Sequence, residues 1–244
     1  MRMKIGEKMS DFFKFEEANT DFPFYNNKPK LSIIDWIVLL AGIILFIGLL
    51  EYIDLPNENY YPIAYFLVTF LPLAFISRGK LGIYFKKLRK SDISVIVKCL
   101  IGYYLYAIIM VSLISFSGTP TASNAALESS MDIIFWINVF IQIMGEELFK
   151  LSLFLLLMFI IYKLAKNRKM SIVLSVLITL LVFGLMHHTA YADSWLQIIF
   201  VIGLGSVFYL YAYLKTKNIL TSYIVHLLID LIVFTLGALA PAMI

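Results

Sequence analysis

The sequence predicts an all-α protein, a polytopic bundle that crosses a membrane about seven times, and two observations indicate this fold class. First, 61% of the 244 residues are hydrophobic and 15% are charged, and the mean hydropathy of +0.88 is too high for a soluble domain. Second, apolar runs long enough to span a bilayer alternate with short polar connections. These runs cover about residues 31–50, 60–77, 92–116, 132–162, 171–190, 195–214 and 218–241.

Lysine and arginine are sorted between the two sides of the predicted membrane. Eighteen of the 20 lie in residues 1–30, 78–90, 163–169 and 215–217, and the other connections carry none. Because Lys and Arg concentrate in cytoplasmic connections, we expect the N-terminus inside and the C-terminus outside. The expected location is a cell membrane, such as a bacterial plasma membrane, with the lipid bilayer as a partner. The basic residues form no single patch, so we exclude nucleic acid as a partner.

Residues 1–30 are the expected cytoplasmic tail. They contain no apolar core, so we expect no cleavable signal peptide and a first span that acts as its own insertion signal. The piece from residue 11 to residue 24 is rich in phenylalanine. It either lies along the membrane surface, with Phe12, Phe13 and Phe15 immersed, or is an irregular tail.

The remaining residues, 31–244, are expected to form a single membrane domain, because no connection is long enough for a soluble one. Ser129 or Ser130 is the expected N-cap of the fourth span, with Asp132 as an acid in its first turn. The only cysteine, Cys99, lies in an apolar run. That excludes an intrachain disulfide and a zinc site built from cysteines.

Three ionisable residues interrupt the fourth run, and they are the strongest functional signal in the sequence. Glu146, Glu147 and Lys150 lie near its middle, where each charge opposes insertion by roughly 2.5 to 3.5 kcal/mol. Lys150 shares a helix face with both glutamates, so either can pair with it. One lysine cannot neutralise two carboxylates, so at least one glutamate must be protonated, hydrated or paired with another helix.

The three histidines of the chain all follow these charges. His187 and His188 end the fifth run, where Phe183 shares a helix face with His187. His226 and Asp230 are four residues apart in the seventh run, so their side chains project side by side. A lone membrane histidine is often only an interhelical hydrogen-bond donor, and for His188 that alternative stays open.

Counting along the helices gives the expected depth of these groups. At 1.5 Å per residue, Glu146 and His187 lie about 22 to 26 Å from the cytoplasmic helix ends, Asp230 about 18 Å and His226 about 12 Å. The first three agree in depth. His226 is too low unless the seventh span is tilted or begins before Asn218.

The residue types support several interpretations. Two Glu, two His and an Asp on three helices can activate water, with a carboxylate base, a histidine that shares the proton and donors for an oxyanion. The same side chains could bind Zn²⁺, and composition does not separate these chemistries. They could also join helices structurally, or relay cations or protons in a transporter. The first three spans carry no matching acidic site, which argues against the transporter.

The order of the motifs is similar to that of a known family. Glu-Glu in the fourth run, F-x-x-x-H in the fifth and H-x-x-x-D in the seventh resemble the three motifs of the CPBP intramembrane proteases, the type II CAAX prenyl protease-like or Abi family. The resemblance covers about residues 131–240. The family usually reads E-E-x-x-x-R, whereas Leu151 occupies the Arg position here. The spacing E-E-x-x-K is similar to that of the PrsW-like branch, and Lys150 would hold Glu147 ionised.

The resemblance implies roles for the candidate catalytic residues. Glu146, with Glu147 in the same motif, would be the base that activates water, assisted by His187. His226 and the residue at Asp230 would form the oxyanion site. Asn is common at that last position, and an Asp donates a hydrogen bond only when protonated; otherwise it must orient His226.

We therefore expect a glutamate-type intramembrane endopeptidase without a cofactor. Its partner would be a membrane-embedded or membrane-delivered peptide or protein substrate, and the resemblance implies CAAX-type processing, bacteriocin immunity or peptide maturation. One alternative is a non-catalytic membrane scaffold or immunity protein that retains the polar cluster. A cation or proton transporter is the less favoured alternative, and the choice between glutamate and zinc chemistry stays open.

Overall fold

The computed structural model describes residues 21–239, and this part of the chain is helical, with no strand. Seven helices are long and apolar enough to cross a membrane, as the sequence predicts. Six are regular, and the sixth span begins as a π-helix, Gln197–Gly203, and continues through a 3₁₀ turn into α6. The helices are α1 (Ile33–Glu51), α2 (Tyr61–Ile76), α3 (Lys90–Phe116), α4 (Ile133–Ala165), α5 (Arg168–Leu185), α6 (Val207–Thr216) and α7 (Ile219–Leu239).

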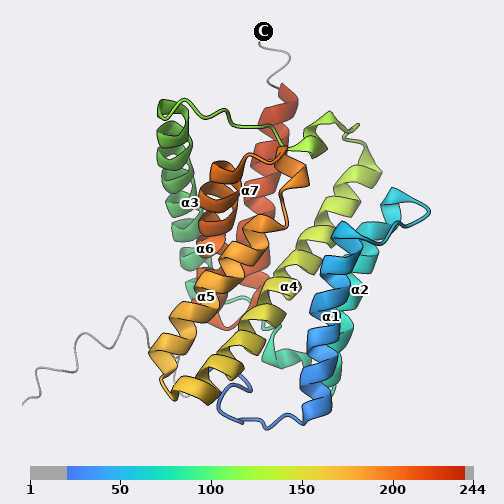
Figure 1. The fold of residues 1–244 in the computed structure, drawn as a ribbon, viewed down its shortest axis with the longest axis vertical. Helices are drawn as coiled ribbons and strands as arrows, with labels where there is room; N and C mark the ends of the chain where they lie inside the picture. The colour runs from blue at the N-terminus through green and yellow to red at the C-terminus, as the bar shows by residue number, and fades with distance from the viewer. Residues whose placement is uncertain (1–20, 240–244) are drawn as a thin grey trace, which may run out of the picture.

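Helix α4 is the centre of the bundle. It packs against α1, α2, α5 and α7, and it runs obliquely through the molecule, with α1 and α2 at one edge and α3 at the other (Figure 1). Every residue from Gly145 to Leu156 is buried. A helix surrounded on all sides must be apolar on all faces, and any charge on it must meet another helix.

Two close approaches of backbones bring the helices together around this centre. A Cβ atom on Gly145 would lie 2.9 Å from the backbone of Tyr65 and Phe66, so glycine lets α2 reach α4 one residue before the glutamates. A Cβ atom on Gly184 would lie 2.7 Å from the Cα of Gly203. Small residues at both contacts allow this packing.

The start of α4 differs from the sequence prediction. Asp132 is itself the N-cap, since its Oδ1 accepts a 2.8 Å hydrogen bond from the backbone N–H of Phe135. Ser129 and Ser130, the expected caps, lie in the preceding connection. Asp is as good an N-cap as Ser, and the cap falls where the backbone leaves the extended conformation.

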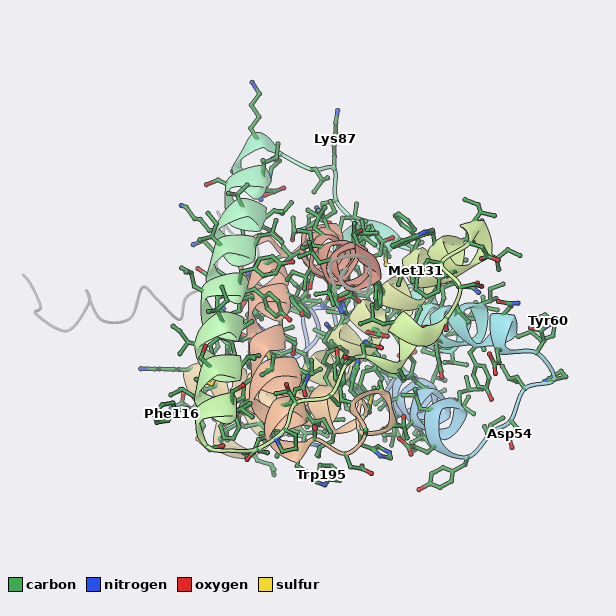
Figure 2. The ribbon with its side chains drawn as sticks, turned by 90° about the horizontal axis from the view of Figure 1, so that it is seen from above. Asp54, Tyr60, Lys87, Phe116, Met131 and Trp195 are labelled. Atoms are coloured by element: carbon green, nitrogen blue, oxygen red, sulfur yellow. The ribbon has the colours of Figure 1, made fainter. Side chains whose placement is uncertain are left out.

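The connection from α3 to α4 crosses one end of the bundle. The chain from Phe116 to Met131 passes between these helices in the view onto that end (Figure 2). The side chain of Gln197 holds this connection through two hydrogen bonds to Ala122. It accepts from the backbone N–H of Ala122 at 2.8 Å and donates to the carbonyl of Ala122 at 3.0 Å. This connection therefore covers the end of the bundle at which α4 begins.

The first described residues pack inside the protein. Phe22, Phe24 and Tyr25 are buried, and the ring of Phe22 meets that of Phe154 edge to face, with centroids 5.3 Å apart. The membrane-surface positions expected for Phe12, Phe13 and Phe15 lie outside the described residues. The end of the tail thus closes the base of the bundle between α4 and α6.

The connections rich in Lys and Arg lie at one end of the bundle, and the connections without them lie at the other, together with the C-terminal end of α7 (Figure 1). This is the arrangement that the charge pattern predicts. The orientation itself, with the N-terminus inside, stays a prediction.

Candidate active site

Helices α4 and α7 meet through a buried network centred on Glu147. Its Oε1 lies 2.5 Å from Nζ of Lys150 on the same helix and 2.8 Å from Nδ1 of His226 on α7. Its Oε2 accepts a hydrogen bond from the hydroxyl of Ser222, one turn before His226. The sequence left open which glutamate pairs with Lys150 and whether a glutamate is paired with another helix. In the structure Lys150 pairs with Glu147, and the carboxylate of Glu147 has partners on both α4 and α7.

The ammonium of Lys150 has few other contacts. Its Nζ lies 4.0 Å from the ring centroid of Phe183 and 4.5 Å from that of Tyr209, so aromatic faces surround the charge. Apart from Glu147, no hydrogen-bond acceptor on the described residues reaches it. Ring faces attract a cation but supply no countercharge, so Glu147 is the countercharge that pairs with Lys150.

Glu146 has a different environment from its neighbour. It points toward a cavity, and its Oε1 accepts a 3.0 Å hydrogen bond from the amide of Gln142, one turn earlier on α4. Among the described residues, the nearest basic nitrogen to this carboxylate is Nε2 of His226, which lies 3.9 Å from Oε2, beyond hydrogen-bond distance. The two adjacent glutamates therefore have different surroundings: Glu147 lies in a closed network, and Glu146 lies at the wall of a cavity.

The imidazole of His226 is fixed in orientation. It stacks on the ring of Tyr209, with centroids 4.4 Å apart and an interplanar angle of 15°. Because a carboxylate only accepts hydrogen bonds, Nδ1 must carry the proton that points to Glu147. The other nitrogen, Nε2, faces Glu146 and Asp230, whose Oδ2 lies 3.6 Å away.

The expectation that His226 lies too low for the site is wrong. Helix α7 begins at Ile219, close to the expected start, and its first N–H donates to the carbonyl of Tyr84. The counts for Glu146 and His187 were made along α4 and α5, and both of these helices run obliquely through the molecule (Figure 1). A residue count along an oblique helix overstates its height in the membrane.

His187 lies just beyond the C-terminal end of α5 at Leu185. Its ring packs on Phe183 with centroids 4.6 Å apart, and its Nδ1 lies 2.7 Å from the carbonyl oxygen of that residue. A carbonyl oxygen only accepts, so Nδ1 carries the proton and Nε2 is left with a lone pair. Burial lowers the pKa of His187, although the carboxylate of Glu146 opposes this shift. His187 is therefore held as a neutral base.

His188 points elsewhere. Its Nε2 lies 3.2 Å from Oε2 of Glu51 at the end of α1, its Nδ1 lies 3.3 Å from Oδ1 of Asp193, and its ring stacks on Trp195. The hydrogen bond with Glu51 raises the pKa of His188. This histidine joins two connections at the end of the bundle and does not line the cavity.

A cavity of about 770 Å³ brings four of the five predicted residues together: Glu146, His187, His226 and Asp230. The fifth, Glu147, lies behind His226 and does not line it. The cavity reaches from these groups to the end of the bundle where α2 and α4 begin. Its interior offers a carboxylate, a neutral imidazole and a fixed second imidazole within one space.

The sequence alone did not single out several side chains that complete the site. Gln142 contacts Glu146, Ser222 contacts Glu147, and Tyr209 supports His226. Tyr191 lines the cavity, accepts a hydrogen bond from Asn124 and is neutral, because burial raises its pKa to about 12. Only Gln142 and Ser222 carried a sequence signal, since each lies one turn from a motif residue.

The described residues contain no group of three or more His, Cys, Asp or Glu side chains placed to hold a metal ion. His226 already uses Nδ1 for Glu147, so only its Nε2 could face an ion in the cavity. A zinc site would need three or four ligands converging on one point. The side chains as placed do not fit that requirement.

Comparison with known proteins gives one match. The family model described as "Type II CAAX prenyl endopeptidase Rce1-like" matches residues 129–232, which include α4, α5, α6 and most of α7. No curated protein and no solved structure matches the chain. The matched range contains all five predicted catalytic residues and is close to the range that the motifs indicate.

Proposed function

We propose that the chain, whose residues 129–232 match the Rce1-like family model, is an intramembrane endopeptidase of the CAAX protease family. Glu146 is the base that activates water, and His187 assists it. The observation that supports these roles is the separation of the two glutamates. The carboxylate of Glu147 is already paired with Lys150, Ser222 and His226. Glu146 instead lines the cavity together with the neutral His187.

The proposed reaction begins with a water molecule in the cavity. Glu146 takes its proton, and the hydroxide oxygen bonds to the carbonyl carbon of the substrate peptide. His187, through the lone pair on Nε2, accepts a hydrogen bond from the same water and orients it. When the tetrahedral intermediate collapses, the C–N bond breaks and Glu146 returns the proton to the leaving amine. The products are a carboxylic acid and an amine.

His226 is the proposed oxyanion donor. With Nδ1–H donated to Glu147, protonation of Nε2 gives an imidazolium whose second N–H points between Glu146 and Asp230. A fixed charged donor of this kind stabilises an oxyanion without reorganising. Asp230 then acts as a carboxylate that attracts the Nε2 proton and orients the ring, so it need not be protonated. CAAX-type processing, bacteriocin immunity and peptide maturation are the roles in which such cleavage would serve.

Cleavage of a membrane peptide by the purified full-length protein tests this proposal. Glu146→Gln keeps shape and hydrogen bonding but cannot take a proton, and His187→Ala removes the assisting base. Each should lower the rate by roughly 10² to 10⁴. His188→Ala is the matched control and should be mild, because that ring does not line the cavity. A Glu146→Gln protein with wild-type activity contradicts the proposal.

A second measurement separates this mechanism from a zinc-dependent one. We expect activity to survive strong chelators and the purified protein to contain no stoichiometric zinc. Zinc at one per chain, lost together with activity and restored with it, would replace the proposed mechanism by a metal-assisted one.

The alternative is a non-catalytic membrane scaffold that keeps the polar cluster as a joint between helices. The closed network of Glu147, Lys150 and His226 favours it, because such a network stabilises the contact of α4 with α7. A scaffold requires no group at the cavity wall. It therefore predicts that Glu146→Gln leaves the phenotype intact, whereas Glu147→Ala lowers abundance.

A further inference from the structure

Negative charge predominates on the wall of the active-site cavity. Four carboxylates line it: Glu58, Asp132, Glu146 and Asp230. Among the described residues that line it there is no Lys and no Arg. Its bases are the two imidazoles: burial lowers the pKa of His187, and His226 is the proposed charged donor.

The nearest lysine does not change this balance. Lys150 lies behind the wall, and its ammonium is 2.5 Å from the carboxylate of Glu147, which is also outside the lining. The two charges cancel at a distance. What a substrate meets inside the cavity is therefore the field of Glu146 and Asp230, which the single positive charge proposed for His226 balances only in part.

The mouth of the cavity is acidic as well. Glu58 precedes α2, Asp132 caps α4, and both are exposed. The side chains of Asn59 and Asn138, joined by a 2.6 Å hydrogen bond, hold these two helix ends together. The two acids therefore lie on neighbouring helices at the end of the bundle shown in Figure 2.

The connections at this end carry the same charge. Residues 51–59, 117–132 and 191–194 contain six Asp or Glu and no Lys or Arg. The positive-inside rule explains the missing cations, but it sets no number of acids, since Asp and Glu contribute little to orientation. Nor does it explain why carboxylates face into a cavity. Acidic groups in a concave, low-dielectric site focus the field and raise the local concentration of cations.

From this charge distribution we infer that the protease selects a cationic peptide segment, with Lys or Arg beside the scissile bond, and disfavours substrates that bring carboxylates into the cavity. This inference rests on the proposed function.

Three membrane peptides that differ only in the two residues flanking the cleaved bond test this inference: Lys–Lys, Gln–Gln and Glu–Glu. With wild-type protein in nanodiscs, we expect kcat/KM to fall in that order, by roughly 10- to 10³-fold in total at low salt. The difference should shrink in high salt, because the mouth is exposed to solvent. Equal rates, or faster cleavage of the Glu–Glu peptide, overturn the inference.

Variants at the mouth give the matched control. Glu58→Lys should reduce the preference for the Lys–Lys peptide, because it reverses a charge that lines the cavity. Asp54→Lys, the same charge reversal at the same exposed end but outside the lining, should leave the preference unchanged. If both variants change the preference equally, the selectivity belongs to the whole surface and not to the cavity.

Binding separates this inference from the proposed function. The His187→Ala protein keeps all four lining carboxylates, and we expect it to bind the Lys–Lys peptide more tightly than the Glu–Glu peptide. Selective binding without cleavage by the wild type would support the inference and reject the protease. Cleavage without charge preference would do the reverse. Failure to bind any of the three peptides also overturns the inference.

Discussion

At the Lys- and Arg-rich end of the bundle, acidic residues pair with basic side chains that reach solvent. In the middle of the bundle, an acidic residue pairs with a basic side chain that is buried. At that end three Asp residues each pair with an Arg: Asp35 with Arg78, Asp92 with Arg89 and Asp21 with Arg168, at 2.7, 2.9 and 2.6 Å. The side chains of Arg78 and Arg89 are 58% and 49% exposed, whereas Lys150, the partner of Glu147, is 1% exposed. Water solvates the first group of cations and not the last.

The difference teaches which charges serve the fold and which serve a site. Asp35 and Asp92 accept hydrogen bonds from backbone N–H groups at the starts of their helices, so these pairs cap helices at the membrane surface. A charge in the middle of the bundle has no such use and costs more to insert. Glu146 and Glu147 are therefore the charges that need a functional explanation.

The two large cavities repeat this contrast. The second cavity, of about 640 Å³, lies at the opposite end and is lined by Lys28, Lys80, Lys86 and Lys217, with Asp21 as its only acid among the described residues. The active-site cavity is lined by four acids and two histidines, with no Lys or Arg among its described residues. The sorting of charge from which the membrane orientation is predicted thus also gives the two cavities opposite net signs.

Chemical labelling from outside the cell tests whether the two ends of the bundle lie on opposite sides of the membrane. It has the largest expected effect, because each position should either react or not react. In a Cys99→Ser background, single cysteines at Asn57, Ser123 and Asp193 should react with a membrane-impermeant thiol reagent on intact cells. Cysteines at Lys87 and Asn167 should react only after lysis, because the positive-inside rule places their end in the cytoplasm. Labelling of position 87 but not position 123 would reverse the orientation.

Removal of Glu147 should have the largest effect on stability. Glu147→Ala leaves Lys150 and His226 buried without their shared carboxylate, and breaking such a pair costs about 3–5 kcal/mol. Thermal unfolding in detergent measures the loss. The double variant Glu147→Gln with Lys150→Met should recover most of it, because no unpaired charge is then buried. Additive losses in the double variant would show that the two residues are not coupled.

The ion pair of Asp21 with Arg168 should contribute less, about 1 kcal/mol, because both side chains are partly exposed. Burial would raise the pKa of Asp21, but the hydrogen bonds from Arg168, Tyr25 and the backbone N–H of Phe22 together outweigh it and lower the pKa below its usual value of 3.8. A lowered pKa in the folded state means that the carboxylate stabilises the fold at a pH above 3.8. This stabilisation is lost as the pH falls through the lower folded value. Asp21→Asn should therefore lower the melting temperature at pH 7, with a smaller difference near pH 3. A constant difference contradicts the charge-based explanation.

His188 should give the smallest effect and the opposite pH dependence. Its hydrogen bond with Glu51 raises its pKa, so the stabilisation is complete below pH 6.5 and is lost as the pH rises through the higher folded value. His188→Ala should lower the melting temperature slightly at pH 6 and not at pH 8.5, while activity changes little. A large loss of activity would instead place His188 in the site.

The sequence by itself determined what depends on length, composition and spacing along one helix. Apolar runs of spanning length fix the number of helices, because a backbone in lipid must satisfy its hydrogen bonds internally. Charge sorting fixes which connections share an end of the bundle. The spacing of Glu147 and Lys150, and of His226 and Asp230, fixes which pairs share a helix face.

The tertiary structure alone decided what depends on the tilt and rotation of one helix against another. Sequence spacing let Lys150 pair with either glutamate, and the approach of α7 through Ser222 and His226 selects Glu147. Residue counting placed His226 too low, because it takes no account of the oblique courses of α4 and α5. The sign of the cavity wall was equally hidden, since its carboxylates come from separate parts of the chain. Interhelical distances arise from packing over the whole bundle, and no local spacing encodes them.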